Sequence, residues 1–284
     1  MNLAEDDQFR RAVAFRALHE ADGAFVIPNP WDAGTARLLA DLGYPALATT
    51  SAGLAFALGR PDAVNLVDRT ETLRNAGEIA VATPLPVSGD LESGFARTPD
   101  EIAETIRLAA EAGLVGGSIE DATGKPGEPI YPLAVAVDRV AAAAEAAKAL
   151  PFPFTLTARA ENFGHGRRDL DDTIARLRAY AEAGADVLFA PSLPDLDAVR
   201  AVCRSVSRPV NVLAGGALGG FTVAELSDCG ASRISVGSGL ARLALASLVR
   251  AAREILADGR FEVLADALPY AEMNTLMSAP VSAD

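Results

Sequence analysis

The sequence predicts an α/β fold, a TIM-type (β/α)8 barrel of eight parallel strands and eight helices. Short apolar runs alternate with amphipathic stretches, and the runs seldom alternate apolar and polar residues, which is typical of strands buried on both faces. At Gly43, Gly113, Gly184 and Gly230 a helix end is followed by a glycine and then directly by a strand. Eight strand–helix units in roughly 250 residues predict a closed barrel.

The expected strands are short stretches that end in small or polar residues. The first four carry AFVIPN, ALATT, LPVSGD and VGGSIE, and the last four carry FTLTARA, DVLFAP, PVNVLA and RISVG. Their apolar and β-branched content favours strands, and their length is that of buried parallel strands. In chain order they lie near residues 24–29, 46–50, 85–90, 115–120, 154–160, 186–191, 209–214 and 233–237.

Amphipathic stretches between these strands predict the outer helices. Asp32 stands just before the first of them and is expected to cap its N-terminus. In chain order the helices are expected over residues 33–42, 68–81, 99–112, 133–149, 170–183, 194–205, 222–229 and 240–257.

A doubly wound open sheet is the main alternative to the barrel. That fold calls for a glycine-rich phosphate turn after the first strand, and the sequence there is PNPWDAG. No linker or low-complexity run divides the chain. We therefore expect one domain over residues 1–284, with the barrel at about 20–245 and a C-terminal helical segment at about 246–284.

Composition narrows the classes of partner. The formal net charge is −13, from 38 acidic and 25 basic residues, which argues against nucleic-acid or anionic membrane partners. Two histidines are too few for a multi-histidine zinc site. The N-terminus does not have the pattern of a signal peptide, and the two cysteines form no close-spaced motif. The expected location is the cytoplasm.

Carboxylates gather where three neighbouring strands are expected to end. Asp90 and Glu92, in PLPVSGDLESGFA, follow the third strand, Glu120 ends the fourth, and Arg159 ends the fifth. Strand residues two apart share a face, so Asp90 and Glu92 are expected to point into the barrel mouth together. Converging acids repel unless a cation lies among them, and Mg²⁺ prefers oxygen ligands. The pattern predicts a Mg²⁺ site completed by Glu120, with Arg159 binding a substrate carboxylate.

Other interpretations of these acids and of nearby glycines stay open. Asp90 and Glu92 could cap a helix or lie on the surface, and Asp121 is expected to be structural because Glu120 takes the inward face. The glycines in 213–216 and 236–241 follow the last two strands, where many barrels bind phosphate, although they also suit plain helix entry.

Over about residues 20–245 the chain resembles the isocitrate lyase/phosphoenolpyruvate mutase (ICL/PEPM) superfamily. The matching stretches are NPWDAGTARLLADLGYPALATTSAG, GRPD, GDLESGF, SIEDAT and LTARAEN, in the order of the family and at similar spacing. The resemblance implies a barrel whose last helix is exchanged between subunits of a homodimer or homotetramer. It also implies Mg²⁺, with Mn²⁺ as a substitute, and a small 2-oxo acid handled through an enolate.

The resemblance also implies roles for individual residues. Metal ligands or holders of metal-bound water are Asp90, Glu92, Glu120 and Asp62, and the substrate-binding positions are Trp31, Ser51, Ala52, Gly53, Asp90 and Arg159. Ser51 to Gly53 match a loop that binds the substrate carboxylate. The expected catalytic residues are Arg159, Glu120 and Lys125.

The chain departs from the pattern of the family's lyases on the loop after the fourth strand. Those lyases carry Lys-x-Cys-Gly there, whereas this loop reads EDATGKPGEPIYP, with Lys125 but no cysteine and no asparagine. Decarboxylation depends least on a loop acid, so the expected activity is carbon–carbon cleavage or decarboxylation of a small 2-oxo or 2-hydroxy acid. The expected branch is the one containing oxaloacetate decarboxylase and carboxyphosphonoenolpyruvate phosphonomutase. The alternatives are a C–P hydrolase or mutase of the phosphonopyruvate type and a non-catalytic 2-oxo acid binder.

Overall fold

Eight parallel strands form the centre of the protein in a computed structural model that describes residues 3–278. Their hydrogen-bonded order is β1-β8-β7-β6-β5-β4-β3-β2. A backbone hydrogen bond from Ala48 N–H to Pro28 O (3.1 Å) joins the two edges, so the barrel is nearly closed. The strands are β1 Phe25–Ile27, β2 Leu47–Ala48, β3 Val87–Asp90, β4 Gly116–Glu120, β5 Thr155–Arg159, β6 Val187–Phe189, β7 Val210–Leu213 and β8 Arg233–Ser235.

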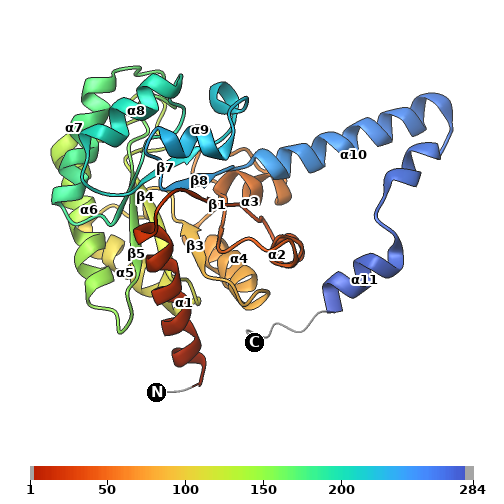
Figure 1. Cartoon of the computed structure of the whole chain (residues 1–284), viewed down its shortest axis with the longest axis horizontal. Helices are drawn as coiled ribbons and strands as arrows, with labels where there is room; N and C mark the ends of the chain where they lie inside the picture. The colour runs from red at the N-terminus through yellow and green to blue at the C-terminus, as the bar shows by residue number, and fades with distance from the viewer. Residues whose placement is uncertain (1–2, 279–284) are drawn as a thin grey trace.

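Helices surround the barrel as an outer ring (Figure 1). Two short 3-10 helices, η1 and η2, accompany them at Gly216–Leu218 and Glu262–Asp266. The α-helices are α1 Leu3–Glu20, α2 Ala33–Asp41, α3 Ser51–Ala57, α4 Arg69–Val81, α5 Pro99–Glu111, α6 Leu133–Lys148, α7 Leu170–Glu182, α8 Leu196–Ser205, α9 Val223–Asp228, α10 Gly239–Asp258 and α11 Tyr270–Ser278. The predicted barrel is confirmed.

The local signals for helix ends are present. Asp32 caps α2, its carboxylate accepting from the Thr35 N–H at 2.7 Å, as predicted. The four glycines that precede strands have φ between +84° and +108°, values that only glycine adopts without strain. The predicted joins between helix and strand are therefore confirmed.

Two helices, α1 and α3, were not predicted, and α1 precedes the barrel. Helix α11 lies in the C-terminal segment that was expected to be helical over about residues 246–284. Ser51 to Gly53, expected in a loop, form the first turn of α3, and Thr50 caps that turn. This expectation was wrong because α3 has only seven residues, too few to show a helical period in the sequence.

Helix α1 closes the amino-terminal end of the barrel. Ala12 and Phe15 are fully buried against Ile27, Ala46 and Val115. The opposite end, where the strands have their carboxyl ends, is therefore the end available for a site.

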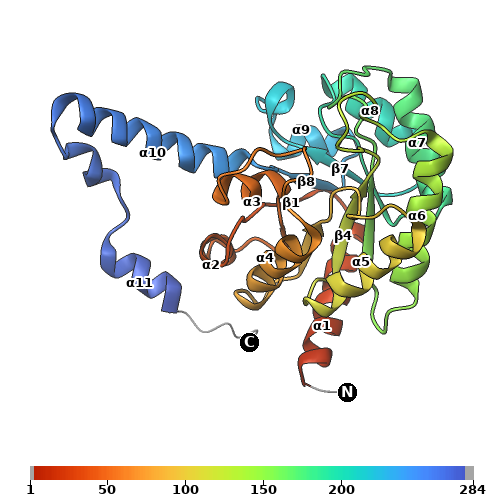
Figure 2. The same cartoon turned by 180° about the vertical axis from the view of Figure 1, so that it is seen from behind.

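The C-terminal segment extends away from the barrel. Helix α10 extends outward from the end of β8, and α11 follows it beyond a bend (Figures 1 and 2). Residues of α11 contact α2. Along α10 the described side chains are largely exposed, and the larger apolar ones at least 40% exposed are Leu243, Leu245, Leu248, Val249 and Leu256. Among residues 3–278 we find no helix with the length and apolar character of a membrane span.

Candidate functional site

A cavity of about 280 Å³ opens at the carboxyl ends of the strands. Its lining comes from almost every strand or from the residues just beyond it. The polar and charged lining residues include Asn29, Thr49, Ser51, Asp62, Ser88, Asp90, Ser118, Arg159, Glu161, Asn211, Arg233 and Ser235. The barrel interior is thus polar, whereas branched apolar residues usually fill it.

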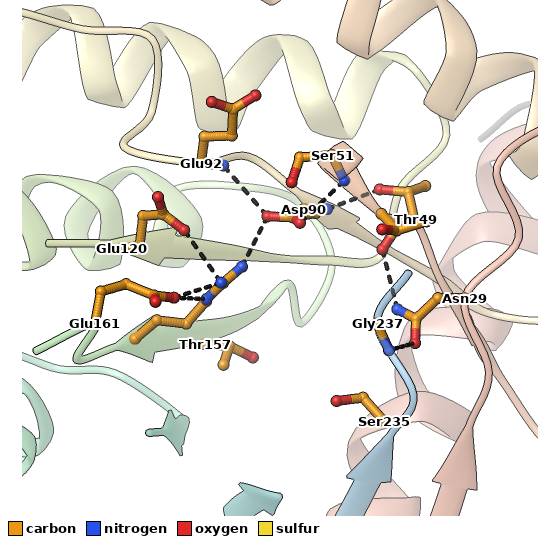
Figure 3. A network of polar contacts seen from close by, with 12 residues as sticks. Asn29, Thr49, Ser51, Asp90, Glu92, Glu120, Thr157, Glu161, Ser235 and Gly237 are labelled. Carbon is orange, nitrogen blue, oxygen red and sulfur yellow. Dashed lines mark hydrogen bonds and ion pairs between the residues drawn. The ribbon is translucent and has the colours of Figure 1, made fainter. Parts of the chain in front are cut away.

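Asp90 is the most connected carboxylate of this cavity (Figure 3). Its Oδ2 accepts from the Ser51 N–H at 3.1 Å, and its Oδ1 lies 3.0 Å from Nη1 of Arg159. Its backbone N–H donates to Thr49 Oγ1 at 2.8 Å. These contacts lock the side chain in one orientation, toward the cavity.

Arg159 lies among three acids. Besides Asp90, its guanidinium contacts Glu120 Oε2 at 3.2 Å and Glu161 Oε1, with Nε at 2.9 Å from the latter. It also lies over the ring of Phe189, 5.1 Å from the centroid. Burial alone lowers the pKa of Arg159, but the acids around it raise that pKa well above its ordinary value. Arg159 is therefore a permanent positive charge held in place.

Three further acids at this end of the barrel, Asp62, Glu92 and Glu120, have pKa values above their ordinary range. Burial, together with the charges of Asp90 and Asp62, raises the pKa of Glu92 to about 8. Burial and Asp90 raise the pKa of Asp62, and burial raises that of Glu120 well above its ordinary value although Arg159 opposes the change. The acid cluster of Asp62, Asp90, Glu92 and Glu120 carries more negative charge than Arg159 neutralises.

The backbone at Glu92 is unusual. Its φ is +47°, a left-handed value that non-glycine residues seldom adopt. Its carboxylate turns away from Asp90, and its N–H is 3.4 Å from Asp90 Oδ1 (Figure 3). Such strain is often retained at functional sites.

The acid cluster fits a hydrated divalent cation better than a closed cage. Within residues 3–278, no three His, Cys, Asp or Glu side chains stand close enough together to hold a metal as they are placed. Mg²⁺ often takes one or two protein carboxylates and keeps several waters, and a divalent charge would favour the ionised forms of Asp62, Glu92 and Glu120. These oxygen donors would suit Mg²⁺ or Mn²⁺, and Asp90, with Asp62, Glu92 and Glu120 around it, is the residue that would hold the cation.

The predicted substrate-binding positions divide between the cavity and its wall. Ser51 and Ala52 line the cavity. Gly53 packs behind them, because a Cβ there would lie 2.5 Å from Thr50 Cγ2 and 2.9 Å from Trp31 Cβ. Trp31, whose carbonyl accepts from Asn75 Nδ2 at 2.9 Å, contributes to that wall and not to the lining itself.

Lys125 is separated from the other predicted catalytic residues. It lies exposed on the loop between β4 and α6 and lines a different cavity, of about 930 Å³, with Arg97 and Tyr131. Its loop is anchored by Thr123, whose Oγ1 accepts from the Lys125 N–H at 3.0 Å. In this arrangement the structure does not bring Lys125 to Asp90 and Arg159.

Asp121 is structural, as predicted. It is 3% exposed, and its carboxylate accepts from Tyr180 OH at 2.6 Å and pairs with Arg176 at 3.1 Å. Its Oδ1 also accepts from the Glu161 N–H at 2.8 Å. Asp121 thus fixes the end of β5 from behind the site.

Sequence reasoning assigned no role to several residues that the structure places in the site. Asn29 joins β1 to β8, its Oδ1 accepting from Gly237 N–H at 2.8 Å, and it donates to Thr49 O (Figure 3). Glu161 pairs with Arg159, and Arg233 lies in the cavity lining. The available signal was a charged or amide side chain at the end or the start of an otherwise buried strand.

Comparison with known proteins agrees with this geometry. The sequence model of the phosphoenolpyruvate phosphomutase family matches residues 15–256. The chain belongs to the phosphoenolpyruvate phosphomutase family. The predicted membership of the ICL/PEPM superfamily is thereby confirmed.

Among curated relatives, an uncharacterized protein of Mycobacterium tuberculosis is 32% identical to this chain, and the match covers 92% of this chain and 95% of that protein. It is 31% identical to 2-methylisocitrate lyase of Escherichia coli, over 75% of this chain and 73% of the lyase.

Solved structures share this fold. A provisionally assigned lyase/mutase of Burkholderia cenocepacia J2315 is 57% identical, with 97% and 98% of the two chains covered and a TM-score of 0.93. A phosphonopyruvate hydrolase in complex with oxalate and Mg²⁺ is 21% identical, with 94% of each chain covered and a TM-score of 0.84, which shows a shared fold alone.

Proposed function

We propose that the protein is a Mg²⁺-dependent lyase that cleaves or decarboxylates a small 2-oxo or 2-hydroxy carboxylic acid through an enolate. The observation that carries this proposal is the pair of Asp90 and Arg159, which lines a polar cavity with Asp62 at the carboxyl ends of the strands. Glu120 contacts Arg159 from outside this lining, and the charge of Asp90 helps to raise the pKa of Glu92. Membership of a family that includes 2-methylisocitrate lyase among its relatives supports it.

Asp90 and Arg159 have different roles in the proposed reaction. Mg²⁺, when bound, supplies electrostatic stabilisation of the negative charge that develops next to the breaking bond. Asp90 is held ready for the cation by Ser51 and Thr49, which need not reorganise on binding. Arg159, fixed by Glu120 and Glu161, presents a cation to the anionic substrate.

Loop chemistry favours decarboxylation over cleavage that needs a thiol acid. The loop of residues 121–131 holds no cysteine. The two cysteines are Cys203 on α8 and Cys229 after α9, and neither lines the cavity. Release of CO2 leaves an enolate that water can protonate, so the reaction makes the smallest demand on a side-chain acid.

Cleavage of a carbon–phosphorus bond is the second candidate. The matching family is that of phosphoenolpyruvate phosphomutase. An enolate also results when phosphorus leaves the carbon atom next to a carbonyl group. The same cavity would then bind a phosphono acid.

One assay separates these reactions from a protein that only binds 2-oxo acids. The purified protein is incubated with 2-oxo, 2-hydroxy and phosphono acids, with Mg²⁺ or with chelator, and products are followed by proton and phosphorus NMR. Oxaloacetate is corrected for its spontaneous decay in Mg²⁺. We expect pyruvate in excess of this spontaneous decay only when both protein and metal are present.

The other outcomes are equally informative. Phosphate released from phosphonopyruvate would establish the C–P reaction instead. Mg²⁺-dependent ligand binding without any product would overturn the lyase proposal in favour of a binder.

A further inference from the structure

Arg233 is a buried cation for which the described residues supply no acid. It is 5% exposed and begins β8. Its Nε donates to Asn211 Oδ1 at 2.8 Å, its Nη2 to Thr157 Oγ1 at 3.1 Å, and its Nη1 lies 3.3 Å from His19 Nε2. All three partners are neutral groups. Burial and the charge of Arg159 lower the pKa of Arg233 to about 9.

His19 must be uncharged for this arrangement to hold. A guanidinium only donates, so His19 Nε2 accepts, and the ring proton on Nδ1 donates to Phe15 O at 2.8 Å. Burial and Arg233 lower the pKa of His19 to about 3, which agrees with a neutral ring. Helix α1 therefore positions Arg233 without neutralising it.

The other buried arginines in residues 3–278 have either carboxylates or the face of an aromatic ring against the guanidinium. Arg159 contacts three carboxylates, and Arg176 contacts Asp121 and Asp172. Arg139 donates to two backbone carbonyls and lies over the ring of Tyr131, 4.4 Å from the centroid. A buried charge that has only neutral partners costs free energy unless an opposite charge joins it.

Arg233 lines the same cavity as Asp90 and Arg159. We call Ser118, Asn211, Arg233 and Ser235 the pocket floor; all four are uncharged or positive and all line the cavity. Thr157, which accepts from Arg233, lies two residues before Arg159 on the same face of β5, so the Cα atoms of Thr157 and Arg159 are about 7 Å apart along that strand. Thr157 and Ser235 lie on the side of Asp90 away from Glu92 (Figure 3).

We infer that the pocket floor is an anion subsite built on Arg233, separate from the acid cluster above it. Its occupant is a carboxylate or a similar small oxyanion. The natural source is the second acid group of the substrate, an assignment that rests on the proposed function. A dicarboxylate would then span the cavity from the acid cluster to Arg233, and a separate inorganic anion is the other source of the same chemistry.

Lactate and malate test this inference, because both are stable 2-hydroxy acids and only malate has a second carboxylate. Calorimetric titration in Mg²⁺ is expected to show that the wild-type protein binds malate about tenfold or more tightly than lactate. Arg233→Met should abolish that preference while the lactate affinity stays within about twofold, and Arg233→Lys should keep part of it. Arg204→Met, on the exposed face of α8, is the matched control that should keep the full preference.

Sulfate distinguishes the two sources, and bromide gives a test on the wild-type protein that does not depend on the variant folding. Equal affinity for malate and lactate, together with sulfate raising the Tm of the wild type but not of Arg233→Met, would assign the subsite to a separate anion. Bromide soaked into wild-type crystals should give an anomalous peak beside the Arg233 guanidinium. Absence of that peak, or a malate preference that survives in Arg233→Met, would overturn the inference. Binding needs no turnover, so failure of the proposed lyase reaction would leave these results unaffected.

Discussion

At the scale of single residues, Asp90 combines the largest number of constraints in the site. It accepts a hydrogen bond from the Ser51 N–H, forms an ion pair with Arg159, and raises the pKa values of Glu92 and Asp62. Its side chain is therefore both pre-oriented and surrounded by negative charge, as a ligand for a divalent cation should be.

Replacing Asp90 by asparagine tests the metal site. We expect Asp90→Asn to lower Mg²⁺-dependent turnover roughly 100-fold or more, because the amide keeps the shape but loses the charge that binds the cation. Turnover and Mg²⁺ binding are measured together, and circular dichroism checks the fold. Asp171→Asn, on the exposed start of α7, is the control that should behave like wild type. Full activity in Asp90→Asn would remove Asp90 from the metal site.

His19 makes the stability of the protein depend on pH. Its folded pKa of about 3 lies below the unfolded value of 6.5, so its contribution to stability is complete above pH 6.5. As the pH falls toward 3, the unfolded state takes up the proton first and that contribution is lost. Between pH 7 and pH 5 this loss amounts to about 2 kcal/mol.

His19→Gln is the matching variant, because glutamine can still accept from Arg233 but does not titrate. The free energy of unfolding from urea titrations at both pH values should fall less in the variant than in wild type. Equal losses in the two proteins would mean that His19 is already charged at pH 7 or is not buried in solution.

At the scale of elements, the ends of helices and strands decide where the site residues stand. The Asp32 cap begins α2 directly after the wall residue Trp31, and the buried Asp121 ties the end of β5 to α7. Residues outside the cavity therefore hold its geometry.

The capping prediction is tested by Asp32→Ala. Loss of the bond from the Thr35 N–H should lower the free energy of unfolding by about 1 kcal/mol. Asp41→Ala, at the other end of α2, is the control, since an acid at a helix C-terminus is slightly unfavourable and its removal should cost nothing. Denaturant titration measures both, and an equal loss in the two variants would argue against the cap.

At the scale of the whole molecule, the exposed apolar side of α10 is the feature that the isolated chain leaves unexplained. Leu248 and Leu256 are 64% and 88% exposed, and Leu245 and Val249 lie beside them. Such a surface on a helix that projects from the barrel is typical of an interface. The predicted exchange of this helix in a homodimer or homotetramer therefore stays our proposal.

Light scattering after size exclusion measures the assembly directly. We expect a mass of two or four times 29.3 kDa for the wild type and a monomer for the double variant Leu245→Glu, Val249→Glu. The two charges would be buried unpaired in the interface, which is strongly unfavourable. A monomeric wild type would contradict the proposal.

Much of the fold followed from the sequence because its signals are local. All eight strands and eight of the helices lie where hydrophobic patterns and glycine joins indicated them. Parallel strands also bring their carboxyl ends together, so the gathering of Asp90, Glu120 and Arg159 could be predicted before any coordinates. The expectation that Glu92 points into the barrel mouth together with Asp90 was wrong, because the left-handed backbone at Glu92 breaks the strand alternation and turns its carboxylate away. Helix α3 was missed because its seven residues are too few to leave a periodic pattern.

The sequence by itself determined the barrel, the family and the acids at the strand ends, since each depends on residue type and spacing along the chain. Only the tertiary structure decided which charges meet. It placed three acids around Arg159, kept Lys125 in another cavity, and left Arg233 among neutral partners. Which charges pair depends on side chains from strands that are far apart in the sequence, and the energy of each pair depends on its burial. Local sequence patterns therefore predict neither the pairs nor their energies.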